Sequence, residues 1–342
     1  MIKNFHGNQR VVSALERMVE QDRLPQTLLL AGPQGVGKAT LARRLAAALV
    51  GETAKIEQDD LSLPHNLSLI ADREKWSSEK RAEEPLYFGN HPDFLTFPPE
   101  GPLRQISIQQ MRLLKEFAQF KPVRGARRIF LIDHLDRAND QAANSLLKTL
   151  EEPPEHLVLV LTVENPQDLL PTIRSRSVSF VLSPLSDPEM QAFFSERSVD
   201  HTERRMRLAN GCPGLAISLD LEEYDRRAAA MLQLLKAASG LSPYHAWLQH
   251  SEGVASARED KLDAYLSILY SLLSDVLHLQ QDSGMVRNTE LERDLRSVAN
   301  NTTFEWIKTA ISRVDEVLNL LRRNIQKSIA LDALVLSLRR IQ

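Results

Sequence analysis

The sequence predicts an α/β domain built on a parallel sheet, followed by regions made of helices alone. In the first half, apolar runs typical of buried strands alternate with amphipathic helical segments, and a Gly-rich loop follows the first run. After Ser183 the strand signals stop, and apolar residues recur at helical spacing. With 342 residues, the chain is long enough for two or three such domains.

Apolar runs predict four strands of the sheet. The first is TLLLA at 27–31, and the second is IFLI at 129–132, directly before Asp133. The third is LVLVLT at 157–162, and the fourth is the alternating stretch 178–182. Because such runs are largely apolar on both faces, we expect helices to cover both sides of the sheet.

Helical patterns define the remaining regions. Leu41, Leu45 and Leu49 share one face of a helix that follows the Gly-rich loop. Residues 51–90 are polar and charged, and we expect a loop-rich, partly disordered insertion there. Ser186-Asp187-Pro188-Glu189 marks a helix start, with the proline in the first turn.

These patterns predict three domains: 1–183 as the α/β domain, 184–223 as a small helical domain, and 224–342 as an all-helical domain. In the last domain, Leu262, Leu266, Leu269, Leu273, Val276 and Leu277 line one face of a long helix. A second helix carries a continuous apolar seam, for which two interpretations are open: the core of a helical bundle, or a surface that also packs on other subunits. The seam consists of Ile307, Ile311, Val314, Leu318, Leu321 and Ile325.

The Gly-rich loop GPQGVGK at 32–38 predicts a phosphate-binding P-loop, because it lies between a strand and an amphipathic helix. Gly32, Gly35 and Gly37 would let backbone N–H groups turn toward phosphate, and Lys38 would reach the outer phosphates. Asp133, at the end of the second predicted strand, suits the carboxylate that meets a metal ion through water. These five residues are the predicted nucleotide site.

Two features of this site are incomplete. The position after the lysine is Ala39 instead of Ser or Thr, so the hydroxyl that normally holds Mg²⁺ is missing. Thr40 follows, but one helical residue is a rotation of about 100°, which aims its hydroxyl elsewhere. His134 follows Asp133 where a hydrolase has a glutamate; we interpret it as an exposed histidine, with an unusual catalytic base as the alternative. We therefore expect a degenerate site with at most weak ATP or ADP binding.

Charge and cysteine content exclude several classes of protein. The chain has 42 Lys and Arg against 45 Asp and Glu, which argues against a wholly basic nucleic-acid coat. Its single cysteine, Cys212, excludes intramolecular disulfides and a zinc site of four cysteines, and we expect no metal site and no required cofactor. With no apolar leader or membrane-spanning run, these features predict a cytoplasmic protein.

A basic cluster precedes the second predicted strand and consists of Lys121, Arg124, Arg127 and Arg128. We interpret it as a solvated loop, with contact to DNA phosphates as the alternative.

Four segments resemble the bacterial sliding-clamp loaders, a family of AAA+ proteins. AANSLLKTLEEPP at 142–154 resembles their helix-and-loop signature, and LLPTIRSRS at 169–177 is similar to their Ser-Arg-Cys element, with Ser177 in place of the cysteine. GNHPDF at 89–94 and NIQKSIALDALVLSL at 324–338 also match. The resemblance spans nearly the whole chain. It implies that the three domains are an AAA+ α/β domain, a helical lid and a helical collar that joins subunits in a ring.

Within this family, the chain departs from the motor subunits that hydrolyse ATP. Ala39 and His134 replace their hydroxyl and catalytic glutamate, and Gly214 stands where they carry a sensor arginine, while Arg176 is retained. This combination resembles the delta-prime subunits of the DNA polymerase III clamp loader. It implies that the chain is a stator-like subunit of the polymerase holoenzyme and has no ATPase activity of its own. The holoenzyme as a whole is a DNA-directed DNA polymerase, which is a nucleotidyltransferase.

The resemblance also implies a role for Arg176 as an arginine finger that acts in trans on the ATP of a neighbouring motor subunit. Arg174 is a weaker candidate for that role. The implied partners are motor and delta subunits in a hetero-oligomeric ring and, through the complex, the sliding clamp and primer-template DNA. Two alternatives are a motor-type ATPase with atypical residues and an AAA+-derived adaptor unconnected with replication.

Overall fold

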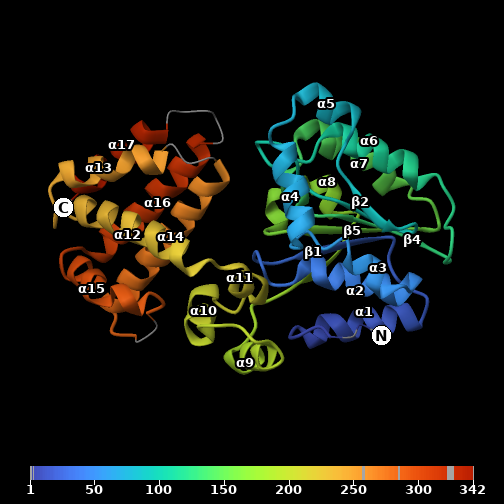
Figure 1. Ribbon diagram of the computed structural model, residues 1–342, viewed down its shortest axis with the longest axis horizontal. Helices are drawn as coiled ribbons and strands as arrows, with labels where there is room; N and C mark the ends of the chain where they lie inside the picture. Colours follow the sequence, from blue (N-terminus) through green and yellow to red (C-terminus); the bar gives the residue numbers. More distant parts are fainter. Residues whose placement is uncertain (1, 3, 256–258, 284–285, 322–326, 342) are drawn as a thin grey trace. The chain divides into compact units, whose positions relative to one another are not determined.

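The computed structural model describes residues 2, 4–255, 259–283, 286–321 and 327–341 (Figure 1). Contacts divide the chain into two compact units, Met1–Ser218 and Leu219–Gln342. The expected fold class, an α/β sheet domain followed by helical regions, is confirmed. The division into three domains at 183 and 223 stays a prediction, since the contacts group the helices of 184–218 with the sheet.

A six-stranded sheet forms the centre of the first unit, with strand order β2-β3-β4-β5-β1-β6. Neighbouring strands are parallel except for the edge pair β2–β3, which is antiparallel. All four predicted strands are present, whereas β2 and β3 were not expected. The strands are β1 (Thr27–Ala31), β2 (Phe88–His91), β3 (Phe94–Phe97), β4 (Arg128–Ile132), β5 (Leu157–Val163) and β6 (Val178–Val181).

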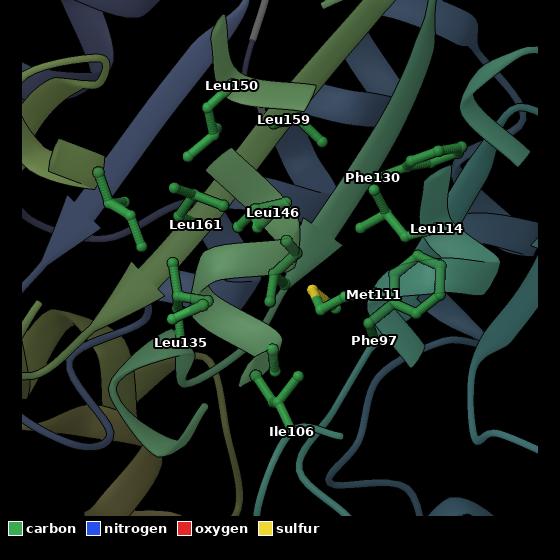
Figure 2. Packing of buried hydrophobic residues seen from close by; sticks show 14 of the residues in the cluster. Phe97, Ile106, Met111, Leu114, Phe130, Leu135, Leu146, Leu150, Leu159 and Leu161 are labelled. Carbon is green, nitrogen blue, oxygen red and sulfur yellow. The ribbon is translucent and has the colours of Figure 1, made fainter. Parts of the chain in front are cut away.

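Alternate residues of the central strands feed two separate cores, one on each face of the sheet. In β4, Phe130 and Ile132 pack with the helices α6 and α7, while Ile129 and Leu131 pack on the opposite face with α1 and α2. Figure 2 shows part of the first core, where Leu114 and Leu146 meet the strands. The sheet is therefore covered on both sides, as its apolar strands predict.

Helices of the first unit fall into those around the sheet and those after it. Around the sheet lie α1 (Gln9–Glu20), α2 (Lys38–Val50), α3 (Thr53–Glu57), α4 (Pro64–Arg73), α5 (Ser78–Glu83), α6 (Ile108–Ala118), α7 (Asp140–Glu151) and α8 (Pro171–Arg174), with short 3₁₀ turns η1 (Leu135–Arg137) and η2 (Pro166–Asp168). After β6 come α9 (Asp187–Ser195), α10 (Thr202–Ala209) and α11 (Pro213–Ser218), which we call the lid helices. The start of α9 is confirmed, and Ser186 and Glu189 form a capping box there.

The expectation of a loop-rich, partly disordered segment at 51–90 is wrong. This segment forms α3, α4, α5 and strand β2. Its polar composition hides buried ion pairs: Arg73 Nη2 lies 2.7 Å from Glu100 Oε2, and Arg43 pairs with Asp60 at 2.5 Å. Since these partners come from neighbouring elements, the charges that suggested a solvated loop hold the segment against the sheet.

A turn at His91-Pro92-Asp93 links β2 to β3 and organises the loop before β4. The buried Asp93 carboxylate accepts hydrogen bonds from the backbone N–H groups of Val123, Arg124 and Gly125, at 2.7, 2.8 and 3.2 Å. Three N–H donors on one carboxylate make a strong, charge-assisted anchor. The turn therefore fixes the loop 119–127 to the edge of the sheet.

The second unit is helical throughout its described part (Figure 1). Its elements are α12 (Leu221–Ala238), α13 (Tyr244–Ala255), α14 (Glu259–Gln280), η3 (Thr289–Leu291), α15 (Glu292–Asn300), α16 (Phe304–Leu321) and α17 (Lys327–Arg339). Two buried tryptophans tie helices together: Trp247 donates to Asp332 Oδ1 at 2.8 Å, and Trp306 donates to the Leu338 carbonyl at 3.1 Å.

The apolar residues predicted to line α14 are buried, apart from Leu277, which is half-buried. Along the seam of α16, Ile307 and Val314 are buried and Ile311 and Leu318 are half-buried. The Leu321 side chain and Ile325 lie outside the described residues. In the described part of the chain, we find no helix whose length and hydropathy would suit a bilayer span.

Candidate functional site

The predicted P-loop forms the turn between β1 and α2, as its sequence context requires. Gly32, Gly35 and Gly37 have φ angles of 147°, 75° and 107°, a region that L side chains rarely adopt. The loop begins with the Gly32 N–H donating to the Val163 carbonyl of β5 at 3.2 Å. These glycines therefore build the tight turn, and Lys38 is the first residue of α2.

The lid helices lie directly on this loop. The Gly214 N–H donates to the Gly35 carbonyl at 2.8 Å. A Cβ on Gly35 would lie 2.5 Å from the Leu215 backbone nitrogen, and one on Gly214 would lie 3.0 Å from the Gly35 oxygen. Because main chain meets main chain here, Gly35 has no room for a side chain, whereas a Cβ on Gly214 would fit if its neighbours moved by a few tenths of an ångström. The N-terminal turn of α11 thus packs on Gly35, while Pro33 and Gln34 of the same loop are exposed.

Lys38 is engaged within the loop itself. Its side chain is 5% exposed, and Nζ donates to the carbonyls of Gly32 at 2.6 Å and Pro33 at 3.0 Å. Burial lowers the pKa of Lys38, and the nearby carboxylates of Glu164, Asp133 and Asp136 oppose that shift. The ammonium group that a P-loop offers to phosphate is here satisfied by main-chain oxygens.

Neither residue after Lys38 replaces the missing hydroxyl. Ala39 packs against the core beneath β1. The Thr40 hydroxyl lies 3.5 Å from Arg43 Nη2, whose guanidinium is buried among the acidic residues of the 51–90 segment. Among the residues described here, no group of three or more His, Cys, Asp and Glu side chains is arranged to hold a metal ion.

Asp133 is held at the end of β4 by a threonine of the next strand. Thr162 donates its hydroxyl proton to Asp133 Oδ1 at 2.6 Å and accepts the His134 N–H at 2.8 Å. His134 has a φ of 55°, so the chain turns sharply into η1, which carries Asp136. One oxygen of Asp133 is thus already committed to Thr162, and the backbone turns away at the residue where hydrolases carry a glutamate.

Arg176 lies at the end of the turn that follows α8. Its Nη2 is 2.8 Å from Glu151 Oε1, and its Nη1 donates to the Thr172 carbonyl at 3.0 Å. The Arg176 side chain is 35% exposed, and that of Glu151 is 49% exposed. Arg174, the weaker candidate, is hydrogen-bonded to Gln167 instead. Among the described residues, Arg176 makes no hydrogen bond or ion pair with the P-loop residues.

Three of the four residues in the basic cluster are already engaged. Arg124 pairs with Glu52, and Arg127 pairs with Asp22 at 2.5 Å. Arg128 is buried and donates to the carbonyls of nearby turns. The interpretation as a solvated loop is therefore correct for Lys121 and Arg124, which are exposed, and wrong for Arg128, which is the buried first residue of β4. The ion pairs weaken the alternative of phosphate contacts.

Sequence reasoning missed Glu151, Thr162 and Leu215 as parts of the site. Glu151 lies in the segment 142–154 whose resemblance was noted, so a search for acidic partners of Arg176 could have found it. Leu215 carries no such signal, since only its contact with Gly35 reveals that it covers the loop.

Comparison with known proteins shows that the chain is similar to subunits of DNA polymerase III. The model of the family described as DNA polymerase III, delta subunit, matches residues 7–186. The chain is 27% identical over 334 residues to the DNA polymerase III subunit delta' of Bacillus subtilis (strain 168), covering 96% of this chain and 95% of that one. It is 30% identical over 243 residues to the delta' subunit of Pseudomonas aeruginosa, covering 70% and 60%.

Among solved structures, a DNA polymerase III gamma subunit-related protein from Thermotoga maritima is similar at 21% identity and a TM-score of 0.44, covering 95% of this chain and 98% of that one. The family model spans more than half of the chain, and the delta' relative from B. subtilis matches it almost end to end. The chain therefore belongs to the DNA polymerase III delta' family of clamp-loader subunits.

Proposed function

We propose that this chain is a stator-like clamp-loader subunit that does not hydrolyse ATP itself, and that Arg176 is an arginine finger for ATP bound by a neighbouring motor subunit. The observation that carries the proposal is a contrast within the first unit. The chain's own lid packs on Gly35 and Lys38 is bonded within the P-loop, whereas Arg176 presents a partly exposed guanidinium.

The state of the P-loop argues against ATP turnover in this subunit. A bound triphosphate would have to draw Lys38 from two carbonyls. It would then find no hydroxyl at Ala39 to hold Mg²⁺ and no glutamate after Asp133 to polarise water. We propose that Gly32, Gly35, Gly37, Lys38 and Asp133 are a degenerate nucleotide site, and that the subunit requires no cofactor.

The chemistry of Arg176 suits action on a neighbour's phosphate. A guanidinium stays charged and presents five N–H donors in one plane, which match phosphate oxygens. Placed at the γ-phosphate, it neutralises the charge that develops as the terminal phosphoryl group is transferred to water. Within the described residues only two of these five donors are used, by Glu151 and by the Thr172 carbonyl.

The proposed partners follow from membership in the clamp-loader family. The subunit would join motor and delta subunits in a hetero-oligomeric ring, and through them act on the sliding clamp and primer-template DNA, in the cytoplasm. In the second unit, α17 exposes Ile329 by 59% and Leu336 by 42%, two helical turns apart on one face. Such a face supports a collar that packs on other subunits. DNA synthesis itself is then the activity of other subunits of the holoenzyme.

Reconstitution with the partner subunits tests the proposal. We expect Arg176→Ala to lower clamp- and DNA-stimulated ATP hydrolysis, because a finger supplied in trans accelerates turnover at its site by about 10³–10⁵-fold. Arg174→Ala is the matched control and should retain most of the activity. Unchanged stimulated hydrolysis with Arg176→Ala would overturn the finger. Robust Mg²⁺-dependent hydrolysis by the purified chain alone would identify a motor-type ATPase instead.

A pull-down provides a separate check on the partners. The full chain should recover clamp-loader subunits from a mixture of purified candidates. Recovery of none of them would favour the adaptor alternative, in which the same fold serves a role outside replication.

A further inference from the structure

We propose that Glu151 is a positioning residue, which holds the Arg176 guanidinium in the orientation needed by a neighbour's phosphate. The inference rests on the function proposed above and adds a second residue to it. Glu151 is the last residue of α7 and lies in the segment 142–154.

Two contacts fix the guanidinium from different sides. Glu151 Oε1 accepts from Nη2 at 2.8 Å, and the Thr172 carbonyl accepts from Nη1 at 3.0 Å. Because the guanidinium is planar and rigid, anchoring both terminal nitrogens fixes the orientation of the plane as well as its position. The Thr172 carbonyl alone would leave the group able to rotate about that single hydrogen bond.

The anchoring leaves the group competent to bind phosphate. Two of five N–H donors are used within the described residues, so three are available for the oxygens of a ligand. A bidentate contact with phosphate needs two of them. The Glu151 carboxylate therefore orients Arg176 without saturating it.

The backbone that carries Glu151 is itself held on both sides. Leu146 and Leu150 of α7 are buried in the core on one face of the sheet. Immediately after the helix, the carbonyls of Pro153 and Pro154 accept from Gln26 Nε2, at 3.5 and 2.8 Å. Glu151 is thus a rigid support for a long, flexible side chain, and the end of α7 is tied to the start of β1.

The contact should affect catalysis far more than folding. Both side chains are substantially exposed, and ion pairs of that kind contribute little to stability. An unrestrained arginine, however, populates many rotamers, so only a fraction of them would present the guanidinium to a phosphate. Loss of Glu151 should therefore lower kcat for stimulated ATP hydrolysis while KM for ATP stays the same.

The test uses the complete reconstituted clamp loader with a set of variants of this chain. We expect Glu151→Ala to lower the stimulated kcat about three- to tenfold, a range set by the rotamer freedom that arginine regains. Glu151→Gln keeps an acceptor oxygen and should recover part of the rate, and it serves as a second variant if the alanine protein folds poorly. Glu152→Ala is the matched control, since the neighbouring glutamate has no ion pair among the described residues.

Comparison with Arg176→Ala separates the two proposals. If Arg176→Ala lowers the rate but Glu151→Ala matches the Glu152→Ala control, the finger stands and the positioning role is overturned. If Arg176→Ala has no effect, the finger itself is overturned. In the double variant, Glu151→Ala should cause no further loss; an additional loss would show that Glu151 acts through another group and would also overturn the inference.

Discussion

The backbone nitrogen of Gly214 lies 2.8 Å from the carbonyl oxygen of Gly35, so the lid is hydrogen-bonded to the loop that would otherwise wrap around phosphate. The contact joins two segments far apart in the sequence. It is close because neither residue has a side chain, and a Cβ on Gly35 would lie 2.5 Å from the backbone nitrogen of Leu215.

Gly35→Ala should destabilise the first unit by about 2–4 kcal/mol, because it adds backbone strain at positive φ and forces the lid away from the loop. Gly51→Ala is the control: its φ of 80° imposes strain, but a Cβ there meets nothing within 4 Å. Urea unfolding of both variants would measure the difference. Equal losses in the free energy of unfolding would mean that the lid moves aside at little cost and that the contact with Leu215 contributes little to stability.

Titration with ATP should give no saturable heat at micromolar concentrations, with or without Mg²⁺. The reason is that Lys38 is already bonded to the carbonyls of Gly32 and Pro33, and the lid covers Gly35. Isothermal calorimetry on the purified chain measures this directly. A Mg²⁺-dependent isotherm of ordinary P-loop affinity would contradict the degenerate site.

Asp93→Asn should release the loop 119–127, because an amide presents one acceptor oxygen where three backbone N–H groups converge. We expect a loss of about 2–4 kcal/mol in the free energy of unfolding, typical of breaking a buried, charge-assisted network. Cleavage by trypsin after Arg124 and Arg127 should increase in parallel. Asp72→Asn, an exposed carboxylate on α4, should change neither measurement appreciably.

The free energy of unfolding of the Asp59→Asn variant should increase, relative to that of the natural chain, as pH rises. Burial raises the pKa of Asp59, an effect opposed by hydrogen bonds from Asn90 and by the charge of Arg43. The folded chain therefore holds this proton more tightly than the unfolded chain, so the stability of the natural chain falls as pH rises above about 4 and through the folded-state pKa.

The asparagine keeps Oδ1, which accepts from both the N–H and the Nδ2 of Asn90, and removes the titrating charge. Urea unfolding of both proteins across a pH series gives the difference in the free energy of unfolding. A difference that does not change with pH would show that Asp59 does not titrate in this range.

The sequence predicted the central sheet well because its strands are apolar on both faces, a pattern that needs no tertiary information. The runs at 27–31 and 157–162 are buried in full. The strands β2 and β3, at one side of the sheet, were missed, although FLTF at 94–97 is a buried run of the same kind. Its brevity and the polar residues before it obscured the signal.

The segment 51–90 could not be predicted from its composition, because its order depends on partners elsewhere in the chain. Arg43 of α2 forms ion pairs with Glu57 and Asp60, and Arg73 forms an ion pair with Glu100. The periodicity of a sequence shows which face of an element is apolar, but it does not show which charged residues form ion pairs. The same limit applies to Arg176, since its motif was recognised but its partner Glu151 was not.

The motif of the proposed degenerate nucleotide site is visible in the sequence, but the state of the loop is not. The replacement at Ala39 predicts a weakened site. The contacts that Gly35 makes with Gly214 and Leu215 become visible only in the structure.

The bonds from Lys38 to its own loop have a consequence for the energetics of the domain. A ligand that binds only the folded state stabilises it, so the melting temperature increases as the ligand concentration increases. Here the lysine charge is compensated by the carbonyl dipoles of Gly32 and Pro33 without any ligand. The proposed degenerate site therefore predicts a fold that is not stabilised by nucleotide, with a melting temperature that stays constant as the ATP concentration is raised.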